Sequence, residues 1–128
     1  MTIINAAPYP KNMDSHGTTF KTALAVSDIG KAVKPAAVWN AANGITVSAV
    51  GNNDAVLGRL AVVEGDGFCN VQDRGYIEFI SDGSTPTLGQ GVVGGASAGA
   101  VKGATQANGG RGIIVSYDMT ALTVLARF

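Results

Sequence analysis

Histidine and cysteine, the side chains most used as catalytic bases, nucleophiles and metal ligands, each occur once in the chain, as His16 and Cys69. One of each is too few for a zinc site, which takes a tetrahedral set of such ligands. A single cysteine also forms no disulfide within its own chain. Cys69 follows Phe68 in an apolar segment, so we expect a small buried side chain rather than a reactive thiolate. These two residues therefore predict no metal site, no cofactor and no catalytic residue.

Two glycine patterns match motifs that carry chemistry elsewhere. Gly95, Ser97 and Gly99 have the spacing of the nucleophile elbow of serine hydrolases. That mechanism needs a histidine base after the serine, and His16 lies far upstream. Residues 89–94 match the dinucleotide-binding fingerprint, but the sequence after them is a poor helix and no strand–helix–strand unit surrounds them. We assign neither function to these glycines.

Three carboxylates, Glu64, Asp66 and Asp73, lie close together in the sequence around a predicted hairpin. Carboxylates bind calcium, but this spacing is not that of an EF-hand loop. Acidic side chains more often solvate a turn, and we favour that interpretation. Trp39, the single tryptophan, is more typical of a core or interface anchor than of a ligand platform. The whole set of patterns predicts a protein that is not an enzyme.

The composition limits the classes of partner. Of the 128 residues, 46% are hydrophobic and only 14% are charged, with nine basic residues balancing nine acidic ones. The basic residues are dispersed along the chain, so we expect no nucleic-acid binding, which depends on clustered Lys and Arg. Residues 83–101, an uncharged stretch, are too weakly apolar to span a membrane, and we expect no signal peptide at residues 1–17. A surface this poor in charge is typical of one that a protein partner covers.

Short apolar or alternating segments recur along the chain, bounded by glycine, asparagine and aspartate. They predict strands at residues 45–49, 55–64, 68–72, 76–80, 112–117 and 122–128. Gly58 interrupts one of these segments and predicts a bulge. Because no amphipathic helix separates the strands, the sequence predicts an all-β single domain, either a small barrel or a sandwich.

Two segments leave alternatives open. Residues 35–43 form either one or two helical turns beginning at Pro35 or a loop. Residues 89–112 are very rich in glycine and contain no acidic residue. They form either a long flexible loop or a strand of small side chains lying close to another backbone.

Residues 1–22 are predicted to form an extended N-terminal arm, and residues 23–128 the β-barrel domain. Pro8 and Pro10 keep the backbone extended, and turn-forming residues follow them. No apolar period runs through this segment, so it cannot bury enough surface to fold alone. Its apolar residues are expected to dock on a partner; they are Ile3, Ile4, Tyr9 and Phe20.

Several segments together resemble a known family. They are residues 29–34, the strand at 45–50, Gly58, the run 64–76 with its turn residues and Val71-Gln72, the segment 99–103, and the closing hairpin of 112–117 and 122–128. On these segments the chain resembles the small capsid decoration (cement) proteins of tailed bacteriophages. The resemblance implies a small β-barrel or β-tulip-like fold, with no catalytic residue and no cofactor.

The resemblance also implies a structural function. A protein of this kind would bind the outer surface of a phage capsid and stabilise the shell by bridging neighbouring capsomers. Its partners would be the major capsid protein and other copies of itself, with a trimer favoured, and it would be made in the host cytoplasm and reside on the virion. Two alternatives remain: a virion fibre-base or host-adhesion module, and a small-ligand-binding β-barrel.

Overall fold

The computed structural model describes residues 16–36 and 44–128, with His16 described for its backbone alone. The expectations for Ile3, Ile4, Tyr9 and Trp39 lie outside the described residues. Most of the segment 35–43 also lies outside them.

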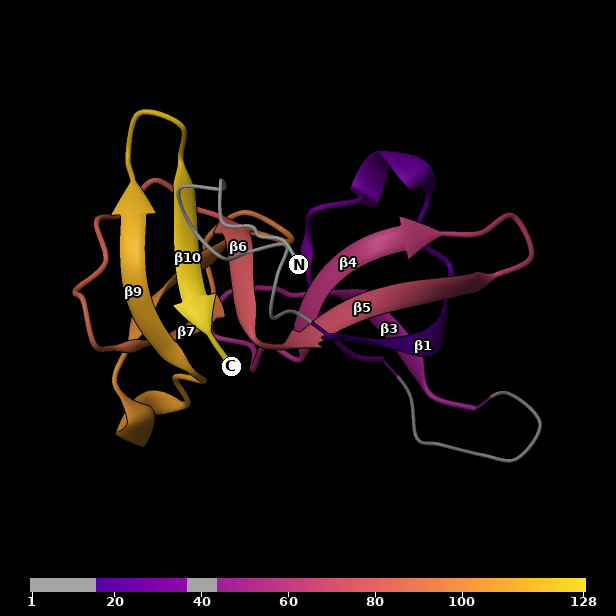
Figure 1. The fold of residues 1–128 in the computed structure, drawn as a ribbon, viewed down its shortest axis with the longest axis horizontal. Coiled ribbons are helices and arrows are strands. Elements are labelled where there is room, and N and C mark those ends of the chain that lie inside the picture. Colours follow the sequence, from indigo (N-terminus) through magenta and orange to yellow (C-terminus); the bar gives the residue numbers. More distant parts are fainter. Residues whose placement is uncertain (1–15, 37–43) are drawn as a thin grey trace, which may run out of the picture.

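Five strands close into a small barrel in the N-terminal half of the chain (Figure 1, right). In order around the barrel they are β1 (His16–Thr22), β3 (Thr46–Ala49), β2 (Ala32–Pro35), β4 (Gly58–Val63) and β5 (Phe68–Arg74). β1 runs parallel to β3, and the other neighbours are antiparallel. The barrel is filled by one cluster of buried side chains: Phe20, Val33, Val47, Leu60, Cys69 and Val71.

The C-terminal half forms two further sheets beside the barrel (Figure 1, left). One has the order β6 (Tyr76–Ile80), β10 (Thr123–Arg127) and β9 (Ile113–Asp118), all antiparallel. The other pairs β7 (Gly91–Gly94) with β8 (Val101–Ala104). Two short 3-10 helices, η1 (Val26–Asp28) and η2 (Gln106–Asn108), complete the elements of the described residues. The prediction of an all-β fold with a small barrel is confirmed.

A second buried cluster joins the two halves of the chain. Ala32, Val50 and Val56 come from the barrel half and pack with side chains from all the other sheets. Those partners are Ile77, Phe79, Val92, Val101, Ile114, Val124 and Ala126. This second cluster therefore fixes the β6-β10-β9 sheet relative to the barrel.

The glycine-rich segment forms strands that touch other backbones, which is the second of the two alternatives. At Gly94, an added Cβ would lie 1.9 Å from the carbonyl oxygen of Gly51. The Gly94 amide donates to Asp54 O at 2.8 Å, and the Asn53 amide donates to Gly94 O at 2.8 Å. Glycine is required here because no side chain fits between the two backbones.

The structure corrects the boundary between the arm and the barrel. Strand β1 begins at His16, so residues 16–22 belong to the barrel. Phe20 is only 8% exposed and packs in the barrel core, so its predicted role as a docking residue of the arm is wrong. Gly17 and Thr18 resemble turn formers in the sequence, but pairing with β5 overrides that local preference.

Two smaller expectations also change. Pro35 ends strand β2, and the Ala36 amide donates to Thr46 O, so no helix begins at Pro35. In β4 the register shift lies between Leu60 and Val62 rather than at Gly58. Gly58 instead allows the backbones of β4 and β5 to lie close together, since a Cβ added at Gly58 would lie 2.1 Å from the carbonyl oxygen of Gln72.

Candidate docking surface

The β6-β10-β9 sheet has one buried face and one face that points away from the core. Val124 and Ala126 of β10 are in the core, so the alternate residues Thr123, Leu125 and Arg127 point outward. Residues that lie opposite each other on paired strands are on the same face of the sheet. Glu78 of β6 and Ser116 of β9 both lie opposite Leu125, so they also point outward. We call this surface the outer face.

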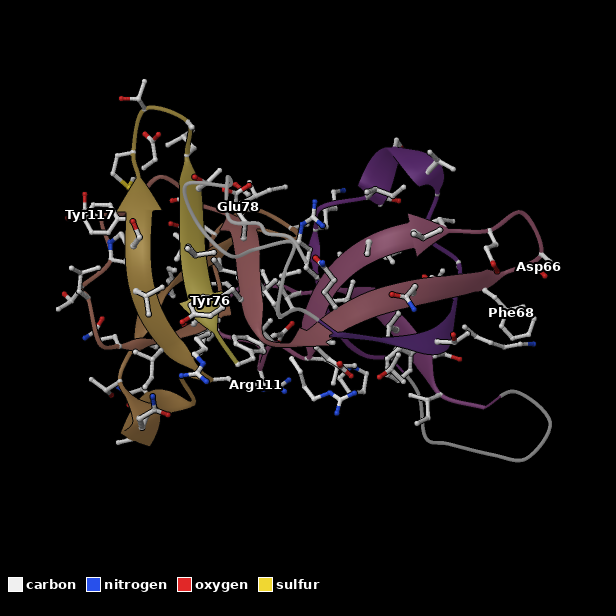
Figure 2. All side chains as sticks on the ribbon, viewed as in Figure 1. Asp66, Phe68, Tyr76, Glu78, Arg111 and Tyr117 are labelled. Carbon is white, nitrogen blue, oxygen red and sulfur yellow. The ribbon has the colours of Figure 1, made fainter. Side chains whose placement is uncertain are left out.

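An open depression lies on the outer face. It is lined by residues of all three strands and of the turn between β9 and β10: Tyr76, Glu78, Val115, Ser116, Tyr117, Asp118, Met119, Thr120, Ala121, Thr123 and Leu125. Figure 2 shows Tyr76, Glu78 and Tyr117 spread across this part of the molecule. The lining mixes apolar and aromatic side chains with hydroxyls and two carboxylates, a composition typical of protein–protein interfaces.

Charges flank this surface without dominating it. The Arg127 guanidinium lies over the Tyr76 ring, 5.6 Å from its centroid. At the other end of the sheet, the Asp118 carboxylate accepts hydrogen bonds from the amides of Thr120 and Ala121, at 2.9 and 3.1 Å. Those bonds fix the β9–β10 turn, which borders the depression.

Strand β9 is the outermost strand of its sheet and is mostly exposed. Its apolar residues Ile113, Val115 and Tyr117 are 53, 41 and 40% exposed, and Ile114 alone is buried. Gly89 and Gln90 bond to the backbone of Ile114, at 2.9 and 2.7 Å. Within the described residues, no other backbone segment bonds to the outer edge of β9 beyond that point.

Arg111 holds the start of β9 against the barrel, and sequence reasoning missed this function. Its guanidinium donates to the carbonyl oxygens of Val56, Leu57 and Asp73 and lies 4.4 Å from the centroid of the Phe128 ring. Burial lowers the pKa of Arg111. The sequence offered little to identify Arg111, because its position between Gly110 and Gly112 is the one feature that sets it apart from the other basic residues.

The residues whose types suggested metal binding or catalysis do not lie together in a common site among the described residues. The Asp66 carboxylate accepts the Phe68 amide in its turn, and the Asp73 carboxylate accepts the Thr18 hydroxyl at 2.7 Å. In residues 16–36 and 44–128, no group of three or more His, Cys, Asp or Glu residues could hold a metal ion. Ser97 lies in the turn between β7 and β8, where the Ala100 amide donates to its carbonyl oxygen, and not at a strand-to-helix turn.

Two further expectations concern the interior and the membrane. Cys69 is 2% exposed, and burial raises the pKa of its thiol, as expected for a core residue. The side chains that fill the five-stranded barrel occupy the space that a bound molecule would need, so the alternative of a ligand-binding barrel gains no support. No helix among the described residues is long and apolar enough to cross a membrane.

Comparison of the chain with protein-family models, with curated proteins and with solved structures finds no match. The resemblance to phage decoration proteins therefore stays a hypothesis that rests on the sequence segments given above.

Proposed function

We propose that this chain is a non-enzymatic structural protein that binds the outer surface of a bacteriophage capsid and stabilises the shell by bridging neighbouring capsomers. The observation that supports this function is the outer face, which carries an open depression lined by aromatic, apolar and polar residues on a molecule with balanced charges. The sequence resemblance supplies the identity of the partner, the major capsid protein.

The outer face has the chemistry of such a contact. Tyr76 offers a large amphipathic surface, and Val115, 41% exposed, offers apolar contact, with the mostly buried Leu125 at the base of the depression. Because the chain has no net charge, contact would depend on apolar and backbone groups rather than on long-range attraction. Many copies on a symmetric lattice multiply modest contacts into a large total stabilisation.

The shell would be stabilised by mass action, because a protein that binds the assembled lattice shifts the equilibrium away from disassembly. Particles that lack this chain should assemble normally and then fail sooner under heat or osmotic shock. If the depleted particles survive stress as well as complete ones but lose host attachment, a host-adhesion module replaces this function.

A substitution on the outer face tests where the capsid binds. Thr123→Arg places a long charged side chain among the residues of the depression and should weaken binding of the full chain to depleted particles by more than tenfold. Thr19→Arg makes the same change at an exposed site on barrel strand β1 and should leave binding unchanged. Equal binding by the two variants would contradict the outer face as the contact.

A further inference from the structure

We infer that the chain before His16 adds a fourth strand to the β6-β10-β9 sheet: residues 12–15 continue β1 and pair antiparallel with the open edge of β6. The occupant of this edge is therefore a segment of the same chain. The inference goes beyond the proposed function, because it depends on the register of the strands and not on the capsid.

The edge of β6 away from β10 pairs with no strand of residues 16–36 and 44–128. β6 is the end strand of its sheet, and this open edge lies on the side of the barrel (Figure 1). Just before β6, the Gly75 amide donates to Phe128 O at 3.2 Å, and the Phe128 amide donates to Gly75 O at 2.8 Å, so Gly75 faces the β10 side. Backbone groups alternate between the two edges along a strand, so those of the next alternate residues point to the open edge: Tyr76, Glu78 and Ile80.

Strand β1 leads onto this open edge. Its first residue, His16, lies opposite Arg74, and only Gly75 separates β5 from β6. A trans peptide points its carbonyl and amide groups in opposite directions, so the Arg74 carbonyl points away from Phe128, the acceptor of the Gly75 amide. Because Arg74 pairs with β1, that strand lies on the edge that β10 leaves open. The chain before His16 therefore starts at one end of the open edge, and an antiparallel continuation of β1 runs along it.

The register of β1 determines which residues pair. Counted back from His16, Asp14 falls opposite Tyr76. Two residues earlier, Asn12 falls opposite Glu78. Tyr76 and Glu78 direct their backbone groups to the open edge, so these are the positions at which two antiparallel strands exchange hydrogen bonds. The side chains of Asn12 and Asp14 share the outer face with those of Tyr76 and Glu78 and extend the lining of the depression.

The sequence of the segment matches the two faces of the sheet. Met13 falls opposite Ile77, which is fully buried, so its apolar side chain lies on the core side, between two polar residues that point outward. Pro10 falls opposite Ile80 and has no amide to donate, so the pairing ends before it. Because residues 12–15 extend an existing strand, no loop has to be closed to bring them to β6.

The added strand determines where the rest of the arm leaves the fold. The predicted docking residues Ile3, Ile4 and Tyr9 precede Pro10, so they begin beside Ile80, at the border of the outer face. The arm and the depression then belong to one surface and can contact the same partner. This consequence alone rests on the proposed function, whereas the strand pairing does not.

Amide hydrogen exchange tests the pairing with purified protein and no particles, so that its failure and that of capsid binding stay distinguishable. The amides of Tyr76 and Glu78 donate to the added strand, so removal of residues 1–15 should speed their exchange by more than tenfold. Removal of residues 1–9 should leave it unchanged. The Ile77 amide, which faces β10, should keep its rate in both truncated chains. Unchanged exchange of Tyr76 and Glu78 after removal of residues 1–15, or an equal rise at Ile77, would overturn the inference.

A pair of cysteines tests the register in the full chain. Directly opposite residues have Cα atoms about 5.5 Å apart, within the range that a disulfide bridges. Asn12→Cys combined with Glu78→Cys should therefore form an intrachain disulfide under oxidised glutathione more than tenfold faster than Lys11→Cys combined with Glu78→Cys, because residue 11 points to the other face. Cys69 is buried, so the unmodified chain serves as the blank. Equal rates for the two pairs, measured by mass spectrometry, would contradict the register.

Discussion

Gly94 shows how closely this fold brings two backbones together. A Cβ at this position would meet the carbonyl oxygen of Gly51, a backbone atom that cannot move aside without shifting the turn at residues 51–54. Gly94→Ala should therefore lower the free energy of unfolding by about 3 kcal/mol, at the upper end of the range for overpacking. Urea denaturation measures the change. Gly65→Ala is the matched control, because nothing lies within 4 Å of its Cβ, and equal losses would contradict this explanation.

Arg111 is the second residue on which the arrangement of the halves depends. Lysine keeps the positive charge but cannot reach the three carbonyl oxygens with one planar group, and it loses the stacking on Phe128. We expect Arg111→Lys to lower the free energy of unfolding by about 2 kcal/mol, as for lost charge-assisted hydrogen bonds. Arg74→Lys, whose side chain is 67% exposed, should change it by less than about 0.5 kcal/mol. Chemical denaturation of both variants checks the difference.

At the scale of elements, Asp82 joins the end of β6 to the turn between β7 and β8. Its carboxylate accepts hydrogen bonds from the amides of Ser84 and Ala96, at 2.9 and 3.1 Å. Burial raises the pKa of Asp82, but these bonds, the Ser84 hydroxyl and the charge of Lys102 outweigh that effect and hold it below its usual value. The folded state therefore binds this proton less readily than the unfolded state does.

The sign of the pH dependence follows from that lowered pKa. The contribution of Asp82 is fully present above the unfolded pKa of about 3.9 and is lost as the pH falls below it, through the lower pKa of the folded state. Asp82→Asn should cost about 1 kcal/mol at pH 7, the typical value of a lost hydrogen bond. As the pH falls below 4, the Asp82→Asn variant should also lose less free energy of unfolding than the unmodified chain does. Thermal unfolding measured from pH 7 to pH 2 decides this, and an unchanged acid profile would contradict the explanation.

Strands with clear alternation could be predicted from the sequence, and strands defined by distant partners could not. Residues 76–80 alternate inward and outward and form β6 as predicted. β7 shows no alternation because all four of its residues are buried, and its glycines lie against other backbones. The outer face was not predicted either, since it depends on the pairing of β10 with β6, two strands that are far apart in the chain.

At the scale of the whole molecule, β1 is part of the barrel, so we expect folding to need residues 16–22 and not residues 1–15. A chain lacking residues 1–15 keeps all of β1 and should unfold within a few degrees of the full chain. A chain lacking residues 1–22 loses the strand that closes the barrel between β3 and β5, and it should not fold. Circular dichroism during heating measures both, and similar unfolding temperatures for the two would contradict the position of this boundary.

The shorter truncation also tests the predicted docking residues of the arm. Ile3, Ile4 and Tyr9 are absent from it, and anchors of this kind contribute roughly 1–2 kcal/mol each. Binding of the chain lacking residues 1–15 to depleted particles should therefore weaken by more than tenfold. Sedimentation with particles measures the binding, and binding as tight as that of the full chain would show that the arm has no function in attachment.

The central claim, that this chain coats a capsid, is tested most directly by the protein composition of purified particles. Gel analysis of particles from cells that make the chain should show it in an amount comparable with that of the major capsid protein, because a shell is reinforced only if its many equivalent positions are occupied. Its absence from the particles, or its presence in only a few copies at one vertex, would contradict the proposed function.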